Sequence, residues 1–182
     1  MRKILSGLIG LSLVLSGATS IELASAAPKA FASAPKPATG PAGQVLTVDA
    51  AEGLEDGQRV TVKGRGYDLK VGIYVTFCVM PTKGKKPESC GHFDITGQNN
   101  QAVWVSSNPP FYAALLVKNF DKVTKSVKGK KVSTGSFTVE VPVSKVIGDN
   151  DCTVVQCAIV TRADHTRSDY RKADVVIPVT FK

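Results

Sequence analysis

The chain has 182 residues, of which 43% are hydrophobic and 7% aromatic, with four cysteines and a formal net charge of +8. This is the composition of a globular protein with a basic bias, and it excludes collagen, a coiled coil and a wholly disordered chain. The length fits one domain and hardly two.

The N-terminus has the organisation of a secretory signal peptide. Arg2 and Lys3 are followed by an apolar stretch over residues 4–15, and Ala24-Ser25-Ala26 supplies the small residues that signal peptidase requires. The apolar stretch is shorter than the roughly 20 residues that span a bilayer, which makes a membrane anchor the less favoured alternative. We expect cleavage after Ala26 and a secreted protein, either free or associated with the cell envelope.

The next stretch, residues 27–43, is rich in Ala, Pro, Ser and Gly. Such a segment buries too little apolar surface to offset its chain entropy, and it predicts a disordered linker. The folded domain is then expected over residues 44–182.

Alternation of apolar and polar residues dominates the domain and predicts about seven strands. Turn signals such as Asp56-Gly57 and Gly148-Asp149-Asn150 separate them. Seven short strands with turns between them predict an all-β fold, an immunoglobulin-like antiparallel β-sandwich. Pro178 lacks the N–H donor that a central strand needs, so we expect the last strand at a sheet edge. The predicted strands are 45–48, 59–63, 73–79, 102–105, 136–141, 154–160 and 175–181.

The even number of cysteines in an exported chain predicts structural disulfides. Proximity in sequence favours Cys78–Cys90 and Cys152–Cys157, and a bridge between sheets such as Cys78–Cys157 is the alternative. The spacings match neither a paired zinc knuckle nor a Cys-x-x-Cys redox motif. We therefore expect no metal site and no cofactor.

Residues 53–66 (GLEDGQRVTVKGRG) resemble the opening of neocarzinostatin-like apoproteins, in which a Gly-Leu-x-Asp-Gly turn leads into a strand that ends in Gly-x-Gly. The gap from Cys78 to Cys90 is similar to the first bridge of that family. The step from Cys152 to Cys157, preceded by Asp151, is similar to its second. The resemblance covers about residues 45–181, and blocks such as 72–78 look like those of secreted actinobacterial members.

The resemblance implies a seven-stranded sandwich with a ligand cleft whose floor includes the first disulfide. The chromophore-binding member of the family has an aromatic residue two positions after the first cysteine, where this chain has Met80, and an aromatic-rich ribbon that is replaced here by residues 141–150. We therefore expect a small apolar ligand other than an enediyne, held without turnover. The expected lining is Cys78, Met80, Cys90 and Trp104, although a lone tryptophan on a Val-rich strand is more often part of the core.

A lysine-rich segment follows, in which Asp121 is the one acidic residue. Leu116, Phe120, Val123 and Val127 recur at helical spacing, which predicts a short basic amphipathic helix on an anionic lipid or envelope polymer. This is our alternative function. A solvated insertion whose apolar stripe packs on the sandwich explains the same pattern. The lysines are Lys118, Lys122, Lys125, Lys128, Lys130 and Lys131.

The segment 162–172 interleaves basic, acidic and aromatic residues. It is either an anion or haem site with His165 or Tyr170 as ligand, or a connection between the last two strands held by ion pairs. A lone histidine in a charged loop is usually solvated, and His92 beside Cys90 is interpreted in the same way.

Catalysis and nucleic-acid binding have little support. Asp164, His165 and Ser168 are close in sequence, but a triad is defined by geometry. The chain has neither a Gly-x-Ser-x-Gly nor a His-Glu-x-x-His motif. Its aromatic residues are not interleaved with the basic run as stacking platforms would be. We expect a monomeric binding protein that is not an enzyme.

Overall fold

The computed structural model describes residues 34–97 and 100–182. The predicted signal peptide over residues 1–26 and the start of the predicted linker lie outside the described residues, and both remain predictions. Among the described residues, no helix is long and apolar enough to cross a membrane.

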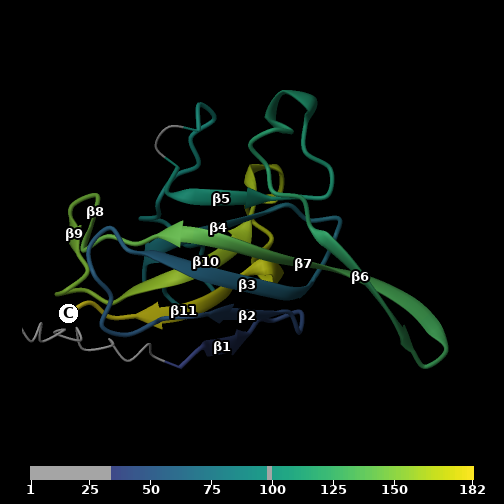
Figure 1. Cartoon of the computed structure of the whole chain (residues 1–182), viewed down its shortest axis with the longest axis horizontal. Helices are drawn as coiled ribbons and strands as arrows, with labels where there is room; N and C mark the ends of the chain where they lie inside the picture. The colour runs from purple at the N-terminus through teal and green to yellow at the C-terminus, as the bar shows by residue number, and fades with distance from the viewer. Residues whose placement is uncertain (1–33, 98–99) are drawn as a thin grey trace, which may run out of the picture. The chain divides into compact units, whose positions relative to one another are not determined.

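Two antiparallel sheets form the domain, and one apolar core cluster contains side chains from both (Figure 1). The five-stranded sheet has the order β1 (Lys36–Thr39), β2 (Val45–Val48), β3 (Arg59–Tyr67), β7 (Lys130–Pro142) and β6 (Asp121–Val127). The four-stranded sheet has the order β11 (Val175–Val179), β10 (Cys157–Ala163), β4 (Ile73–Val79) and β5 (Ala102–Val105). A small hairpin, β8 (Val146–Ile147) with β9 (Asn150–Asp151), and three short 3₁₀ turns, η1 (Phe111–Ala113), η2 (His165–Arg167) and η3 (Arg171–Ala173), complete the described elements.

The core follows from alternation along each strand, because successive side chains of a strand lie on opposite faces. Val60 and Val62 of β3 are fully buried, as are Val75 of β4 and Ile159 of β10. Each such side chain contributes roughly 1.5–3 kcal/mol of burial free energy. The two sheets are therefore held together mainly by aliphatic packing.

An aromatic group closes one end of the core. The ring of Phe137 lies 5.2 Å from that of Tyr67 and 6.1 Å from that of Phe120. Gly64 makes room for Phe137, since a Cβ at this position would lie 2.1 Å from the ring. This glycine is needed for the close approach of β3 to the ring.

The predicted fold class is confirmed: the domain is an antiparallel β-sandwich with disulfides Cys78–Cys90 and Cys152–Cys157. The alternative bridge Cys78–Cys157 is wrong. Each of the seven predicted strand segments overlaps a strand of the structure, and Pro178 lies in β11, an edge strand as expected.

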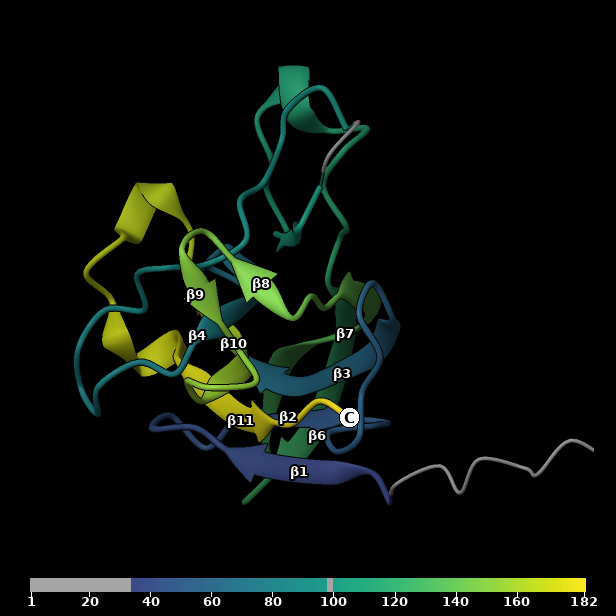
Figure 2. The same ribbon diagram turned by 90° about the vertical axis from the view of Figure 1, so that its left-hand side faces the viewer.

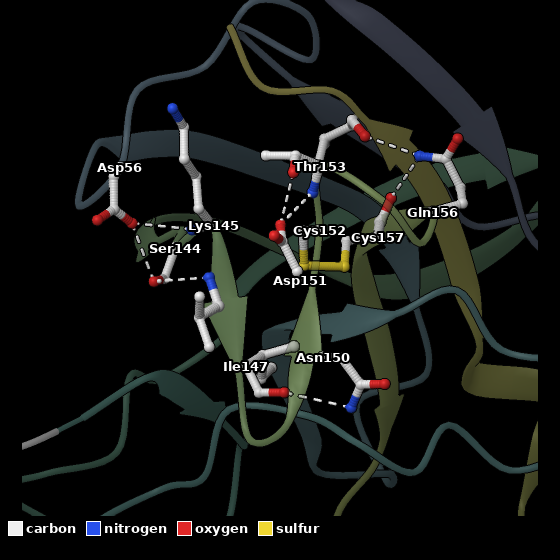
Figure 3. The surroundings of a disulfide bond; sticks show 12 residues. Asp56, Ser144, Lys145, Ile147, Asn150, Asp151, Cys152, Thr153, Gln156 and Cys157 are labelled. Carbon is white, nitrogen blue, oxygen red and sulfur yellow. Dashed lines mark hydrogen bonds between the residues drawn. A yellow bond between two sulfur atoms is a disulfide. The ribbon is translucent and has the colours of Figure 1, made fainter.

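One predicted strand begins too early. Residues 154–156 form the end of a turn closed by Cys152–Cys157, and Val154 is 81% exposed. Figure 3 shows that the Asp151 carboxylate accepts hydrogen bonds from the backbone N–H and the hydroxyl of Thr153, at 2.8 and 2.7 Å. These local hydrogen bonds and the disulfide stabilise the turn. Their stabilisation outweighs the preference of Val154 and Val155 for a strand.

The predicted linker also differs from the structure, because residues 36–39 form β1. This strand pairs with β2 from Lys36↔Val48 to Thr39↔Val45. The turn between the two strands is closed by backbone bonds between Gly40 and Gln44 and between Gly43 and Gly40. Composition alone misled us here, because an edge strand gains its order from backbone pairing and needs few buried side chains.

The predicted amphipathic helix over residues 118–131 is wrong. The segment contains β6, a turn at Lys128 and Gly129, and the start of β7, which together form a hairpin that leaves the sandwich (Figure 1). Apart from Val123, every residue of β6 is exposed. The alternative, an apolar stripe packed on the sandwich, is correct only at its start, where Phe120 is 8% exposed and packs in the core.

Candidate functional site

The candidate site lies on the outer face of the four-stranded sheet. Side chains alternate between the two faces of the sheet along β4 and β10. Cys78, Ala158 and Val160 therefore lie on the face opposite the main core, yet all three are fully buried. They form a second apolar cluster, packed against by Met80, Cys90 and Val176. The outer face is therefore covered where a solvated sheet would carry polar side chains.

An apolar cavity of about 440 Å³ opens beside this cluster. Met80, Val176 and Pro178 line it beside the sheet, and Pro41 lines it from the β1–β2 turn. The loop after β4 supplies a further wall, which consists of Pro81, Thr82, Lys83, Gly84, Lys85 and Pro87. The Cys78–Cys90 disulfide closes the loop that carries this wall. The volume lies within the range of small-molecule sites, about 300–1,000 Å³.

One end of the cavity is polar. Arg171 and Asp174 both line it and form an ion pair at 2.8 Å, and Arg171 also donates to the carbonyl of Ser168. Two buried atoms of this pair, Arg171 Nε and Asp174 Oδ1, have no hydrogen-bond partner among the described residues. Burial raises the pKa of Asp174 to about 6, although the Arg171 and Arg162 guanidinium groups act in the opposite direction. The cavity thus has a charged pair beside an apolar floor, while the two unpaired atoms of this pair are themselves buried.

The four residues predicted to line a ligand cleft do not meet at one hollow. Met80 lines the cavity, and Cys78 and Cys90 belong to the apolar cluster beside it. Trp104 pairs with Tyr74, six residues before Met80 on the same face, which is about 20 Å along the strand. Trp104 instead lines a separate hollow of about 790 Å³.

Trp104 has the surroundings of a structural side chain. It is 3% exposed, packs with Ala113 and Val117, and donates from Nε1 to Asp164 Oδ2 at 3.0 Å. His165 lies against it, with ring centroids 5.0 Å apart, and its Nδ1 is 2.8 Å from the Tyr74 hydroxyl.

The residues considered for haem binding or catalysis lie in separate local networks. Asp164 accepts hydrogen bonds from Trp104 and from both the backbone and the hydroxyl of Thr166, while His165 bonds to Tyr74 and not to Asp164. Tyr170 packs against the main core. His92 is exposed in the loop after Cys90. Among the described residues there is no group of three or more His, Cys, Asp or Glu side chains that could hold a metal ion.

The predicted lysine surface is divided in two. Lys118 lies at the base of the loop after β5, where it bridges to Val105. The other five lysines are exposed on the β6–β7 hairpin. One face of this hairpin carries only polar side chains in its outer part, including Lys122, Lys131 and the Thr124–Ser133 pair, whose hydroxyl oxygens are 2.8 Å apart.

Sequence reasoning missed Pro41, Arg171, Asp174, Val176 and Pro178 as cavity residues. A signal for two of them is present in β11. Val176 and Pro178 alternate with buried Val175, Ile177 and Val179, so the strand is apolar on both faces. An edge strand with two apolar faces indicates that the outer face is also covered.

Comparison with known proteins gives a matching family and related solved structures. The profile of the Neocarzinostatin family matches residues 46–180. The solved structure of macromomycin is similar, with 19% sequence identity, 76% of this chain and 99% of macromomycin covered, and a TM-score of 0.45. Among the curated proteins, none matches this chain.

Proposed function

The chain belongs to the neocarzinostatin family, and we propose that it is a secreted, non-catalytic protein that binds a small apolar ligand in the cavity beside Cys78–Cys90. The observation that carries the proposal is the apolar cavity of about 440 Å³ beside the buried apolar cluster on the outer face of the four-stranded sheet. Membership of the family supports a ligand-binding apoprotein in general. The class of ligand is inferred here from the size and lining of the cavity.

The cavity defines the class of ligand. Met80, Val176 and Pro178 favour a compact apolar body, and the charged Arg171–Asp174 pair that also lines the cavity favours a ligand with one polar group, such as a hydroxyl. Release from water of the apolar body supplies the binding free energy, and the polar pair fixes its orientation. The protein acts by sequestering the ligand.

The methionine content allows a direct test. The chain has two methionines, Met1 and Met80, so the cleaved protein reports on Met80 alone when its methionine methyl group is isotope-labelled. Titration with adamantanol, a compact apolar alcohol, should shift this single NMR signal until it saturates. The Val176→Trp variant, which fills the cavity, should abolish the shift, whereas Val127→Trp on the exposed β6–β7 hairpin, which lines no part of the cavity, should leave it unchanged.

A Met80 signal that does not respond to adamantanol, or that responds equally in Val176→Trp, would reject this cavity as the site. Native mass spectrometry of protein taken from its own culture medium should show a bound species that is lost on denaturation. The mass of that species would identify the natural ligand.

The hairpin supports a second function, binding of an anionic envelope polymer. Its polar face presents ammonium and hydroxyl donors from both strands, and it extends away from the sandwich (Figure 1). Lys122→Glu with Lys131→Glu, two lysines of this face, should weaken binding of long-chain polyphosphate, and added salt should weaken binding by the wild-type protein. Lys36→Glu with Lys63→Glu, the same charge change on β1 and β3, is the control, and equal loss in both variants would contradict a role for the hairpin.

A further inference from the structure

The loop after β5 forms an uncharged projection from the domain. Residues 106–117 contain no charged side chain. The loop is closed at its base, because Lys118 N–H donates to the Trp104 carbonyl at 2.9 Å and Ser106 N–H donates to the Lys118 carbonyl at 3.0 Å. Figures 1 and 2 show the loop rising from the sandwich with η1 at its tip.

The tip exposes large apolar side chains and buries small ones. Phe111 is 92% exposed, Tyr112 66% and Leu115 100%. On the same segment Ala113 is fully buried and Val117 is 6% exposed, and both pack in the cluster that contains Trp104. The tip is therefore an anchored turn that holds its three largest apolar side chains in solvent.

A neighbouring loop supports the projection and widens its apolar surface. A Cβ built on Gly97 would lie 3.3 Å from Leu116 Cδ2, so the turn that contains Gly97 packs against the projection. In this turn Ile95 is 51% exposed. Single exposed apolar residues are common on proteins, but several carried together on a supported projection mark an interaction site.

The dimensions of this tip favour a lipid surface over a folded partner. A stable protein interface involves roughly 20–30 residues on each side, whereas the tip offers a few side chains on a convex turn. A bilayer needs no complementary shape. Phenylalanine and leucine enter its apolar part, and tyrosine is favoured at the level of the headgroups.

Cationic groups lie where lipid phosphates would be. Lys118 is at the base of the projection, and Lys70 and Arg167 line the hollow that Tyr112 also lines. Such side chains extend along an apolar surface and place their charge at the headgroups. The exposed side chains Phe111, Tyr112 and Leu115 can enter the lipid without taking a charge with them, because residues 106–117 contain none.

We propose that the tip formed by Phe111, Tyr112 and Leu115 inserts into the surface of a lipid bilayer and holds the domain there. The site is separate from the apolar cavity and from the lysine hairpin, which leaves the sandwich elsewhere (Figure 1). Insertion of apolar side chains, unlike polymer binding by the hairpin, should persist in salt, since screening acts on charges.

Vesicle sedimentation tests the proposal on the cleaved, full-length domain, with phosphatidylcholine vesicles that contain a minority of phosphatidylglycerol. Phe111→Ser with Leu115→Ser should lower the vesicle partition constant at least about tenfold, because two solvent-facing apolar side chains are removed. Val154→Ser removes a comparably exposed apolar side chain from a distant turn and should have no effect. The free energy of unfolding should stay unchanged in both variants, which separates lost insertion from lost folding.

A fluorescence measurement locates the tip. In Tyr112→Trp, spin labels on the lipid acyl chains should quench the new tryptophan, while buried Trp104 should give only a weak background. Three results would overturn the proposal: no binding of the wild-type protein to vesicles, equal binding by the serine variant, or a dimer without lipid that the serine variant abolishes. The last result would assign the tip to contact between two copies of the chain.

Discussion

Two carboxylates on the outer face of the four-stranded sheet have opposite surroundings. Asp164 is 3% exposed and accepts hydrogen bonds from Trp104 and Thr166, so its buried charge is well solvated by the protein. Asp174 has Arg171 on one oxygen, and its other oxygen is buried without a partner among the described residues. Asp164 thus stabilises the loop around Trp104, while Asp174 keeps one buried oxygen unpaired.

The raised pKa of Asp174 predicts a particular pH dependence of stability. Its pKa is about 6 in the folded protein against 3.8 for an unperturbed aspartate side chain, so the folded state binds the proton more tightly than the unfolded state. The resulting stabilisation is fully present below the unfolded pKa and is lost as the pH rises through about 6. Relative to wild type, Asp174→Asn should therefore become progressively more stable between about pH 4 and pH 7.

Urea unfolding of the two proteins across this range measures the difference. The comparison cancels the contributions of Glu55, Asp56 and Asp151, whose pKa values are lowered chiefly by hydrogen bonds and whose stabilisation is lost on acidification instead. A difference between wild type and Asp174→Asn that stays constant with pH would contradict the burial of this carboxyl group.

At the scale of elements, the stability of the β6–β7 hairpin depends on the backbone conformation of its turn. Lys128 and Gly129 connect β6 to β7 with φ of 48° and 76°, a left-handed pair for which Asn-Gly is the preferred sequence. A Cβ on Gly129 would meet nothing within 4 Å, so Gly129→Ala tests backbone strain without a clash. It should favour local opening by about 1 kcal/mol, and Lys128→Asn should oppose opening by a similar amount.

Amide hydrogen exchange measures this opening. The hairpin amides of residues 122–134 should exchange about fivefold faster in Gly129→Ala and more slowly in Lys128→Asn, because the hairpin opens without the core. The amides of β10 should be unchanged in both variants. Equal changes in β10 would show that the hairpin unfolds only together with the sandwich.

The same hairpin shows where sequence reasoning succeeds and fails. Period-two alternation located the strands of the sandwich because one face of each strand is buried in a common core. Val123 and Val127 are four residues apart, a spacing that fits one face of a helix and equally one face of a strand. The pairing of β6 with β7, which no local pattern reveals, decides between them.

The prediction of the site residues was limited by strand pairing in the same way as the prediction of the hairpin. Met80 and Trp104 are both on the outer face of their sheet, as a shared cleft would require. The pairing Tyr74↔Trp104 separates them along β4, and this register cannot be read from either strand alone. Asp174 and Val176 come to the cavity only because β11 is the edge strand beside β10.

For the whole molecule, the two proposed surfaces and the cavity occupy different parts of one sandwich. The cavity adjoins β11 and β4, the apolar tip rises after β5, and the hairpin extends from β7 (Figures 1 and 2). The three features are formed by different residues, so each can be changed by substitution without replacing a side chain of the others. Binding of a ligand, a lipid surface and a polymer can therefore be measured independently on one protein.

Strand β1 joins the first described residues to the sandwich. It covers the edge of β2, and the turn that follows brings Pro41 to the cavity and Gln44 to the carbonyl of Lys172 at 2.7 Å. A chain that begins at residue 34 should therefore be as stable as one that begins at residue 27. A chain that begins at residue 44 should lose about 1–2 kcal/mol of unfolding free energy, because the pairing with β2 is removed.

Urea unfolding and analytical ultracentrifugation of the three chains check this prediction. The shortest chain should also self-associate, since removal of β1 leaves the β2 edge open to pairing with another copy. It should bind adamantanol more weakly, because Pro41 is lost from the cavity wall. Equal stability and a monomeric state in all three chains would instead make residues 34–43 the linker that their composition predicts.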